Sequence, residues 1–347
     1  MPRNSVALIL PPRETFSPDG AGAVAMVADR LARASSWATH VVGHPVDRPF
    51  DHFVPAHYPL GVLQVVRRLQ PDVVEVHNRP RLAKALAWWH PCVSLVLHND
   101  PRGMAGMRTE RARLGGRLAG IAAVSEWVAA RALPAVATVL PNGFDGPEPA
   151  AERENTIVFA GRIVADKGAD VFIDAMARVL PDAVGWRAKM VGADRFGRNS
   201  PDTPFLRALR PGAVEMLGWR PHADVLALLR TAAIAVVPSV WPEPFGLAAL
   251  EAMASGAALV HTGVGGLSDV VGDAGLLVPP GNATALAEAV RALTRDPPRR
   301  QALAAAGLVQ AQKFGMAATA ARVDAWRAGL LLDLPARPRR PIWDVTE

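Results

Sequence analysis

Two carboxylates, Glu243 and Glu251, occur in the otherwise apolar stretch SVWPEPFGLAALEAMASG, residues 239–256. Glu243 lies between two prolines, which stiffen its backbone and keep it out of a helix. Glu251 follows about two helical turns later among alanines and a leucine. A lone helical glutamate usually faces solvent, but a carboxylate buried in this setting needs hydrogen-bond donors. Neighbouring hydroxyls of a ligand could supply them, because a carboxylate accepts two hydrogen bonds side by side.

A helix is predicted to begin between the two carboxylates. Pro244 suits its first turn, and Phe245, Gly246 and Leu247 would then present backbone N–H groups without helical partners. Such a helix start attracts anions. The stretch therefore combines a site for hydroxyl groups with a site for negative charge.

Two cations lie on another predicted strand-to-helix turn, in VFAGRIVADKGADVF, residues 158–172. Arg162 and Lys167, with Gly161 beside them, are either surface charges or ligands of a phosphate or diphosphate. The anion-binding helix start favours the second interpretation. A glycine-rich turn at residues 263–266 permits a close backbone approach, although it is equally compatible with a plain loop.

These residues must be held by elements that the hydrophobic pattern predicts. Short β-branched runs alternate with longer amphipathic segments, which is typical of parallel sheets covered by helices on both faces. Residues 141–155 carry prolines, glycines and acids without an apolar period, and the alternation restarts after them. The fold class is therefore α/β, with two Rossmann-like parallel-sheet domains facing a central cleft, where ligands bind in such architectures.

The first half contains two further candidates. His98 ends a predicted strand, where it could donate to a sugar hydroxyl, take part in proton transfer, or simply bond to backbone. Gly20 and Gly22 formally fit a dinucleotide-binding pattern, which would suggest an NAD-dependent dehydrogenase. Three prolines separate them from the strand that ends at Leu10, whereas that fingerprint needs a tight turn. A glycine-rich loop facing the cleft fits better.

A basic segment at residues 101–118 could lie on an anionic membrane surface. Around the narrow apolar stripe of Met107, Leu114 and Leu118, a helix would carry four flanking arginines, Arg108, Arg111, Arg113 and Arg117. An ordinary half-buried basic helix is equally compatible with the pattern.

Composition restricts the class of protein. The chain has 347 residues, half of them hydrophobic, and a single cysteine, which excludes a disulfide framework and a multi-cysteine zinc site. It has neither a signal-peptide core nor an uncharged apolar run long enough to span a membrane, so we expect a cytoplasmic protein, either free or peripheral on the inner face of the plasma membrane. The net charge of +6 comes with only four lysines, a usage typical of GC-rich genomes, and nucleic acid is not an expected partner.

Four segments, FAGRIVADKG, VPSVWPEPFGLAALEAMASG, VGGLSDVV and GLLVPPGN, occur in an order and spacing that resemble the retaining family-4 glycosyltransferases of the GT-B type, the glycosyl transferases group 1. The resemblance covers most of residues 155–300, and the pair of glutamates eight residues apart is specific in this context. The first half fits more loosely, through DGAG, DVVEVHNRP, LHND, AAVSEW and LPNGFD.

The resemblance implies a role for each candidate residue. Gly161, Arg162 and Lys167 would hold a donor diphosphate, and Glu251 would hold the ribose hydroxyls. Glu243 and the backbone of residues 245–247 would hold the transferred sugar, and His98 would approach that sugar from the N-terminal domain, so Glu243 and His98 are the predicted catalytic residues. No metal or cofactor is expected, because charge on the leaving diphosphate can be met by the cations and the helix start, and the sequence contains no Asp-x-Asp pair.

The implied domains are an acceptor-side domain at 1–148, a nucleotide-sugar-binding domain at 149–315, a helix at 316–332 that returns to the first domain, and an irregular tail at 333–347. The implied function is retaining transfer of a sugar from a UDP- or GDP-sugar to a hydroxyl of a glycan or glycolipid, in lipopolysaccharide or exopolysaccharide assembly. A nucleotide-sugar epimerase or a catalytically silent sugar-binding protein of the same fold is the alternative, and a dehydrogenase is a remote one.

Overall fold

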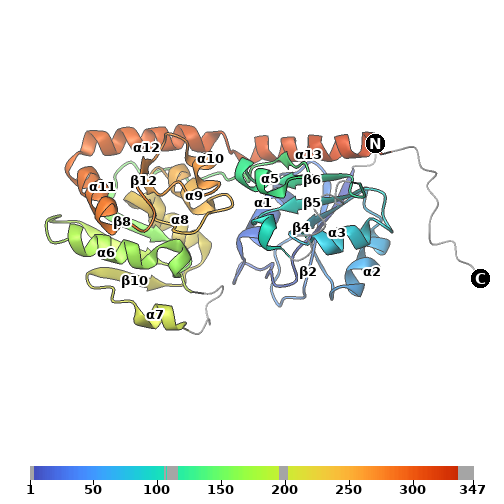
Figure 1. The fold of residues 1–347 in the computed structure, drawn as a ribbon, viewed down its shortest axis with the longest axis horizontal. Coiled ribbons are helices and arrows are strands. Elements are labelled where there is room, and N and C mark those ends of the chain that lie inside the picture. The colour runs from blue at the N-terminus through green and yellow to red at the C-terminus, as the bar shows by residue number, and fades with distance from the viewer. Residues whose placement is uncertain (1–3, 105–106, 108–115, 195–201, 335–347) are drawn as a thin grey trace, which may run out of the picture. The chain divides into compact units, whose positions relative to one another are not determined.

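The computed structural model describes residues 4–104, 107, 116–194 and 202–334. The chain divides into two compact units (Figure 1). Unit 1 comprises Met1–Ser17, Gly22–Pro141 and Met316–Glu347, and unit 2 comprises Pro18–Ala21 and Asn142–Gly315. Residues 141–153, which lack an apolar period, form neither helix nor strand. Each unit has its own parallel sheet.

The sheet of unit 1 reverses its strand order near the middle. Within the described residues its strands are β1 (Ser5–Ile9), β2 (Ala38–Gly43), β3 (Phe53–Pro55), β4 (Val73–His77), β5 (Val93–Leu97), β6 (Gly120–Ala123) and β7 (Thr138–Val139). They lie in the order β3-β2-β1-β4-β5-β6-β7 and pair in parallel. The order switches between β1 and β4. Ligands bind at the carboxyl ends of strands beside such a switch point.

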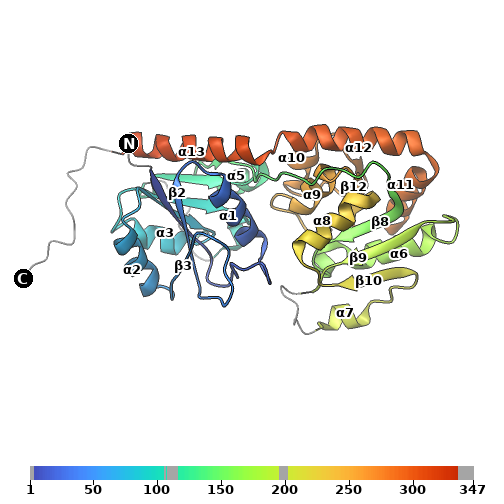
Figure 2. The same cartoon turned by 180° about the vertical axis from the view of Figure 1, so that it is seen from behind.

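Helices cover both faces of this sheet (Figures 1 and 2). They are α1 (Ala23–Ala34), α2 (Leu60–Leu69), α3 (Pro80–Leu86), the 3-10 turn η1 (Pro101–Gly103), α5 (Glu126–Ala132) and α13 (Met316–Leu332). The last helix, α13, packs against α1, and its Ala320 and Val323 join Val96 and Ala122 in a buried cluster. The last described helix of the chain therefore completes the core of the first unit.

Unit 2 repeats the same topology. Its strands are β8 (Glu154–Ala160), β9 (Arg187–Val191), β10 (Val214–Gly218), β11 (Ala232–Val237), β12 (Ala258–His261) and β13 (Leu276–Leu277). Their order is β10-β9-β8-β11-β12-β13, again in parallel, so the switch point lies between β8 and β11. β11 is apolar and buried throughout, and β8 is buried from Thr156 to Phe159, as the centre of a parallel sheet requires.

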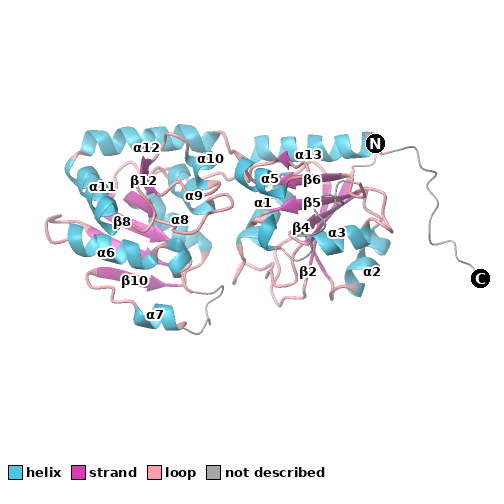
Figure 3. Cartoon of the chain, in the orientation of Figure 1, coloured by secondary structure: helices cyan, strands magenta, loops and turns pink. Residues whose placement is uncertain are grey.

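Seven helices and one 3-10 turn are described in unit 2 among the residues that the structure covers (Figure 3). They are η2 (Ala165–Lys167), α6 (Ala169–Val179), α7 (Pro204–Ala208), α8 (His222–Thr231), α9 (Leu247–Ala254), α10 (Leu267–Val271), α11 (Ala283–Arg295) and α12 (Pro297–Gln312). Phe172 and Met176 of α6 pack with Leu286 and Val290 of α11 in the core. Asn282 and Asp296 cap α11 and α12 by accepting backbone N–H bonds.

Several local predictions differ from the structure. The alternation pattern missed β2 and β3, because β2 mixes polar and apolar residues and β3 has only three residues. It also did not predict α2, α7, α10 and β13. The helix expected from Phe245 begins at Leu247, with Gly246 as its N-cap. Pro244 and Phe245 therefore precede the helix instead of forming its first turn.

Candidate active site

Three polar side chains meet at the switch point of unit 2. Lys167 ends the turn η2 that follows β8, and Ser239 and Glu243 follow β11. Lys167 Nζ lies 2.5 Å from Glu243 Oε1, and Ser239 Oγ donates to the same oxygen at 2.6 Å. The Glu243 side chain is only 10% exposed and that of Lys167 28%. The structure therefore brings two of the predicted residues together, with a serine that the sequence analysis did not identify.

Backbone hydrogen bonds fix the loops that carry this cluster. The carbonyl of Asp166, next to Lys167, accepts the N–H groups of Val240 and Trp241 at 2.9 and 3.1 Å. Thr262 Oγ1, after β12, donates to the carbonyl of Ser239 at 2.6 Å. The loops after three neighbouring strands are thus tied together, and the lysine and the glutamate are held by backbone.

The glycine-rich turn after β12 pairs with the backbone of Glu243. The Glu243 N–H donates to the carbonyl of Val264 at 3.1 Å, and the Gly266 N–H donates to the carbonyl of Glu243 at 2.7 Å. A Cβ on Gly265 would lie 2.4 Å from the Glu243 carbonyl oxygen, and its φ of +71° favours glycine. Between the two interpretations of this turn, the structure supports close backbone approach.

Helix α9 starts directly after Glu243 and Pro244. The first N–H groups that bond within the helix are those of Ala249 and Leu250, both to the carbonyl of Gly246. The side chain of Phe245 is buried and contacts Phe314 edge-on, with ring centroids 5.8 Å apart. This packing anchors the helix start, which is the end of a helix that favours negative charge.

Gly161 and Arg162 follow β8 at the same edge of the sheet. The Gly161 N–H donates to the carbonyl of Val191 at 3.0 Å, and Arg162 is exposed. A Cβ on Gly192 would lie 1.8 Å from the Gly161 carbonyl oxygen, so these two loops approach closely.

Glu251 pairs with a histidine. His222, the first residue of α8, has its Nε2 3.0 Å from Glu251 Oε1, and the Glu251 side chain is only 13% exposed. Glu251 therefore does not occupy the solvent face that a lone helical glutamate usually takes. The ring of His222 meets Phe144 edge-on at 6.4 Å between centroids. The sequence analysis did not identify His222, which begins a weakly amphipathic helix and has no local motif.

His98 lies at the carboxyl end of β5 in unit 1. Its Nε2 is 2.8 Å from Nδ1 of His77, the last residue of the neighbouring β4. The backbone N–H of His98 donates to Asn78 Oδ1 at 2.7 Å. Burial, together with the nearby His77, keeps the pKa of His98 well below its usual value, against the opposing effect of Glu75. His98 is therefore a neutral imidazole, and His77 is a second histidine that the sequence analysis did not identify.

Gly20 and Gly22 lie in the loop between β1 and α1. β1 ends at Ile9 and α1 begins at Ala23, so the tight turn of a dinucleotide fingerprint is absent from this described segment. The start of α1 is occupied by Glu14, whose carboxylate accepts the Ala25 amide. Burial raises the pKa of Glu14, although that amide and His77 oppose the shift. That this loop faces a cleft remains a prediction.

The basic segment is described only in part. Arg108, Arg111 and Arg113 lie outside the described residues. Arg117 lies over the ring of Trp88, with its guanidinium carbon 3.8 Å from the ring centroid, and Trp88 is 65% exposed. In the part of the chain that the structure covers, none of the helices is both long and apolar enough to cross a bilayer.

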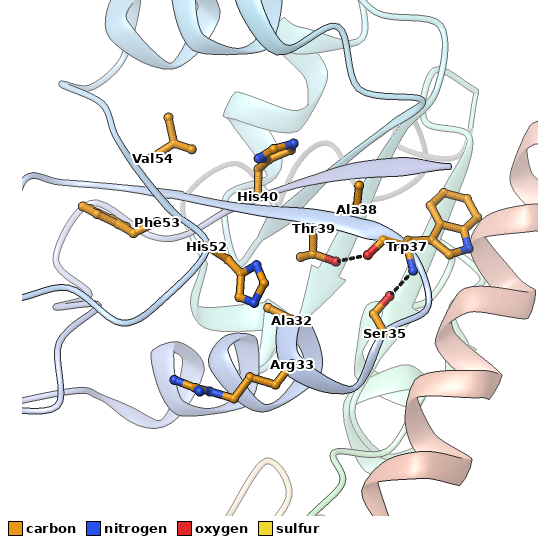
Figure 4. Close-up of a pocket in the computed structure, with 10 residues that line it drawn as sticks. All are labelled: Ala32, Arg33, Ser35, Trp37, Ala38, Thr39, His40, His52, Phe53 and Val54. Carbon is orange, nitrogen blue, oxygen red and sulfur yellow. Dashed lines mark hydrogen bonds between the residues drawn. The ribbon is translucent and has the colours of Figure 1, made fainter. Parts of the chain in front are cut away.

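Unit 1 also has a cavity of about 540 Å³, shown in Figure 4. It is lined by residues near the end of α1 and the beginnings of β2 and β3, including Arg33, His40 and His52. Thr39 Oγ1 donates to the Trp37 carbonyl at 3.3 Å in its wall. These are the amino ends of the strands, opposite to the edge that carries His77 and His98, so the cavity is distinct from the candidate site.

The comparisons with known sequences match part of the chain. Residues 154–296 match the family described as glycosyl transferases group 1. The D-inositol 3-phosphate glycosyltransferase of Corynebacterium aurimucosum is 38% identical over 175 residues, which are 48% of this chain and 41% of that protein. The glycogen synthase of Mycobacterium tuberculosis is 31% identical over 275 residues, 68% of this chain and 63% of that protein. The chain thus spans less than two thirds of the length of these relatives.

The solved structures match nearly the whole chain. HepE of Anabaena, in complex with UDP and glucose, has a TM-score of 0.73 at 19% identity and covers 93% of this chain and 99% of its own. WaaG, described as a glycosyltransferase of lipopolysaccharide biosynthesis, has a TM-score of 0.66 at 16% identity, covering 93% of this chain and all of its own. At these identities the match is evidence for the fold, which is that of the GT-B proteins. The family match assigns residues 154–296 of this fold to the glycosyl transferases group 1.

Proposed function

We propose that this protein transfers a hexose from a nucleoside-diphosphate sugar to a hydroxyl group of a glycan or glycolipid, with retention of configuration at the anomeric carbon. Lipopolysaccharide or exopolysaccharide assembly is the proposed setting. The observation that carries the proposal is the Lys167–Ser239–Glu243 cluster at the switch point of unit 2, inside the segment that matches the glycosyl transferases group 1.

The cluster suits the charges of glycosyl transfer. When the bond between the anomeric carbon and phosphate breaks, positive charge develops on the sugar and negative charge on the leaving diphosphate. Arg162, Lys167 and the start of α9 are suited to the diphosphate, because fixed cations and amide dipoles stabilise charge as it forms. Glu243, held by Ser239 and Lys167 at 2.6 and 2.5 Å, would accept hydrogen bonds from sugar hydroxyls.

Glu251 is proposed to bind the ribose of the donor. Its pairing with His222 at 3.0 Å keeps the carboxylate oriented in a largely buried setting. His98 of unit 1 would act on the transferred sugar. No step of this scheme needs a metal ion or another cofactor.

A UDP-sugar is the first donor to test. The solved HepE structures contain UDP, or UDP-glucose, in a protein with this fold. The names of the related D-inositol 3-phosphate glycosyltransferases and glycogen synthases point to small polyols and to glucans as acceptors worth including beside lipid-linked glycans.

A thermal-shift panel of UDP-, GDP- and ADP-sugars would test donor binding, because a ligand that binds only the folded state raises the melting temperature. We expect one nucleotide class to stabilise the protein and the matching sugar to be transferred to an added acceptor. NAD alone stabilising the protein would contradict the proposal. Appearance of a second sugar nucleotide in the absence of acceptor would instead indicate an epimerase.

Variants connect the activity to the cluster. Lys167→Ala and Glu251→Ala should weaken donor binding, whereas Glu243→Gln should lower turnover more than nucleotide affinity. Lys313→Ala is the matched control, because Lys313 is exposed in the same unit and bonds only to nearby Gln310 in the described residues. Near-native activity in all three site variants would refute the assignment.

A further inference from the structure

A row of buried polar side chains connects α13 to His98 within unit 1. It comprises Asp324 and Arg327 of α13, Glu75 and His77 of β4, and His98 after β5. All five are at most 8% exposed, and Arg327 is fully buried. Such a row is costly to bury unless each member is paired, so its internal geometry is strongly constrained.

The charged end of the row is firmly paired. Arg327 Nε and Nη2 lie 2.9 and 3.1 Å from the two carboxylate oxygens of Glu75, and Nη1 lies 3.1 Å from Asp324. Asp324 also accepts the Ser35 hydroxyl and the Ser36 amide at 2.7 Å. Burial alone would raise the pKa of Glu75, but Arg327 and His77 outweigh it and hold that pKa at about 2. Glu75 is therefore ionised.

An ionised Glu75 determines where His77 carries its proton. His77 Nε2 lies 3.3 Å from Glu75 Oε1, an ion-pair distance with imperfect hydrogen-bond geometry, and it is buried without a hydrogen-bond partner in the described residues. An unprotonated Nε2 would set its lone pair against a carboxylate oxygen. A proton therefore belongs on Nε2, and a His77 that carries only this one proton has Nδ1 as an acceptor.

The same reasoning extends to the next ring. His77 Nδ1 and His98 Nε2 are 2.8 Å apart, so one of them must carry the proton between them. Since His77 Nδ1 is the acceptor, His98 Nε2 is the donor. His98 then exposes an unprotonated Nδ1, and among the described residues no hydrogen bond to that nitrogen occurs.

We propose that His77 carries a single proton, on Nε2, and that Glu75 and His77 are thereby positioning residues that hold His98 as the Nε2–H tautomer, with Nδ1 as a hydrogen-bond acceptor for a ligand hydroxyl. The ligand part of this inference rests on the proposed function, since a sugar hydroxyl is the donor that Nδ1 would meet. The tautomer itself depends only on the row in unit 1. Glu14, in the loop after β1, also lies within electrostatic range of His77.

Long-range ¹H–¹⁵N correlation spectra of the full chain labelled at histidine would test the tautomer, because protonated and unprotonated ring nitrogens resonate far apart. There are nine histidines, and single His→Gln variants would assign the signals of His77, His98 and His90. We expect Nδ1 of His98 to be unprotonated in the ligand-free protein. A protonated Nδ1 with unprotonated Nε2 would overturn the inference.

Two variants ask whether Glu75 and His77 fix that state. Glu75→Gln leaves the buried Arg327 without the carboxylate that binds two of its nitrogens, so this variant is expected to fold poorly. The double variant Glu75→Gln/Arg327→Met removes both charges of this pair together. In this double variant and in His77→Phe, the proton of His98 should move to Nδ1 or exchange between the two nitrogens, so that their signals swap or average. His90, which bonds to the carbonyls of Pro71 and Cys92 in the same unit, is the internal control and should keep its signals.

An unchanged His98 pattern in folded samples of both variants would overturn the positioning role. Once a donor is identified, both variants should lower kcat/KM about tenfold, the effect of one lost hydrogen bond to the ligand, while nucleotide-induced stabilisation stays unchanged. If no sugar nucleotide binds but the spectra of the native protein and the variants are as stated, the proposed function fails and the positioning role stands.

Discussion

The central residue-scale feature is that one carboxylate oxygen of Glu243 is shared between a lysine and a serine. Lys167 Nζ and Ser239 Oγ both lie within 2.6 Å of Glu243 Oε1. This arrangement stabilises the charge of a largely buried carboxylate and at the same time fixes its direction. Removing one partner therefore has two separable effects, on stability and on ligand binding.

Lys167→Met should lower the free energy of unfolding by about 2 kcal/mol, because it leaves the Glu243 carboxylate without its cation. Glu243→Gln should also destabilise the protein. The double variant should lose less than the sum of the two, by about 1 kcal/mol, because its partners are removed together. Urea denaturation of the four proteins would measure the coupling. Strict additivity would contradict the structural role of the pair.

Gly265→Ala should displace Glu243. The new Cβ would lie 2.4 Å from the Glu243 carbonyl oxygen and 2.8 Å from its nitrogen, so the loop must shift. We expect a loss of at least about 2 kcal/mol in stability and a larger relative loss of turnover. Gly212→Ala is the control, since Gly212 also has a positive φ, +55°, but open space around it, and should cost only about 1 kcal/mol of backbone strain. Equal effects of the two substitutions would refute the prediction.

Helix α13 is the element whose docking most depends on electrostatics. Its Arg327 is fully buried and holds both oxygens of Glu75. Apolar contacts of Ala320 and Val323 accompany this ion pair. A buried pair with matched geometry need not add net stability, but breaking it by removing one partner typically costs about 3 to 5 kcal/mol.

Stability should fall with acid in a way that depends on Glu75. Its pKa is about 2 in the folded protein, below the ordinary value of 4.5. A lowered folded pKa stabilises the protein above the unfolded pKa, and this contribution, about 3 kcal/mol, is lost as pH falls from about 4.5 toward 2. Urea unfolding across this pH range should show that the free energy of unfolding falls less steeply with acid in Glu75→Gln/Arg327→Met than in the native protein. A slope identical to that of the native protein would contradict the assignment.

The sequence predicted helices and strands better than it predicted contacts between side chains. The apolar run Ala232–Val237 and the valines of Val73–His77 identify central parallel strands, since both faces of such strands are buried. The positions of Lys167 and Glu243 near strand ends were also evident. Their direct pairing, the pairing of Glu251 with His222, and the row through Arg327 were not, because each joins residues far apart in the chain, 252 positions in the case of Glu75 and Arg327.

On the scale of the whole molecule, the repeated strand order gives each unit its own switch point, with Lys167 and Glu243 at one and His77 beside the other. The arrangement follows from topology and does not depend on individual side chains. Acceptor choice and membrane association are properties of the surface, about which the hydrophobic period carries little information.

Anionic vesicles should retain the protein at low salt and release it at high salt. The exposed Trp88, stacked with Arg117, and the basic segment that follows α3 combine an interfacial aromatic with positive charge. Salt should release the protein because electrostatic binding is screened within a Debye length of about 10 Å at 0.1 M salt. Replacing Arg108, Arg111, Arg113 and Arg117 with Ser should weaken cosedimentation, because it removes positive charges that would bind the anionic lipid. Unchanged sedimentation, or equal binding to neutral vesicles, would show that the segment has only a structural role.

Because α13 belongs to unit 1, the two units are not completed in the order in which their strands are synthesised. The strands of unit 1 leave the ribosome first, but the cation that neutralises Glu75 is contributed by residue 327, after all of Asn142–Gly315 has been made. During translation, Glu75 in the central strand of unit 1 therefore lacks its Arg327 partner until unit 2 has been synthesised. We expect the domain whose strands are translated first to be the last to complete its native contacts.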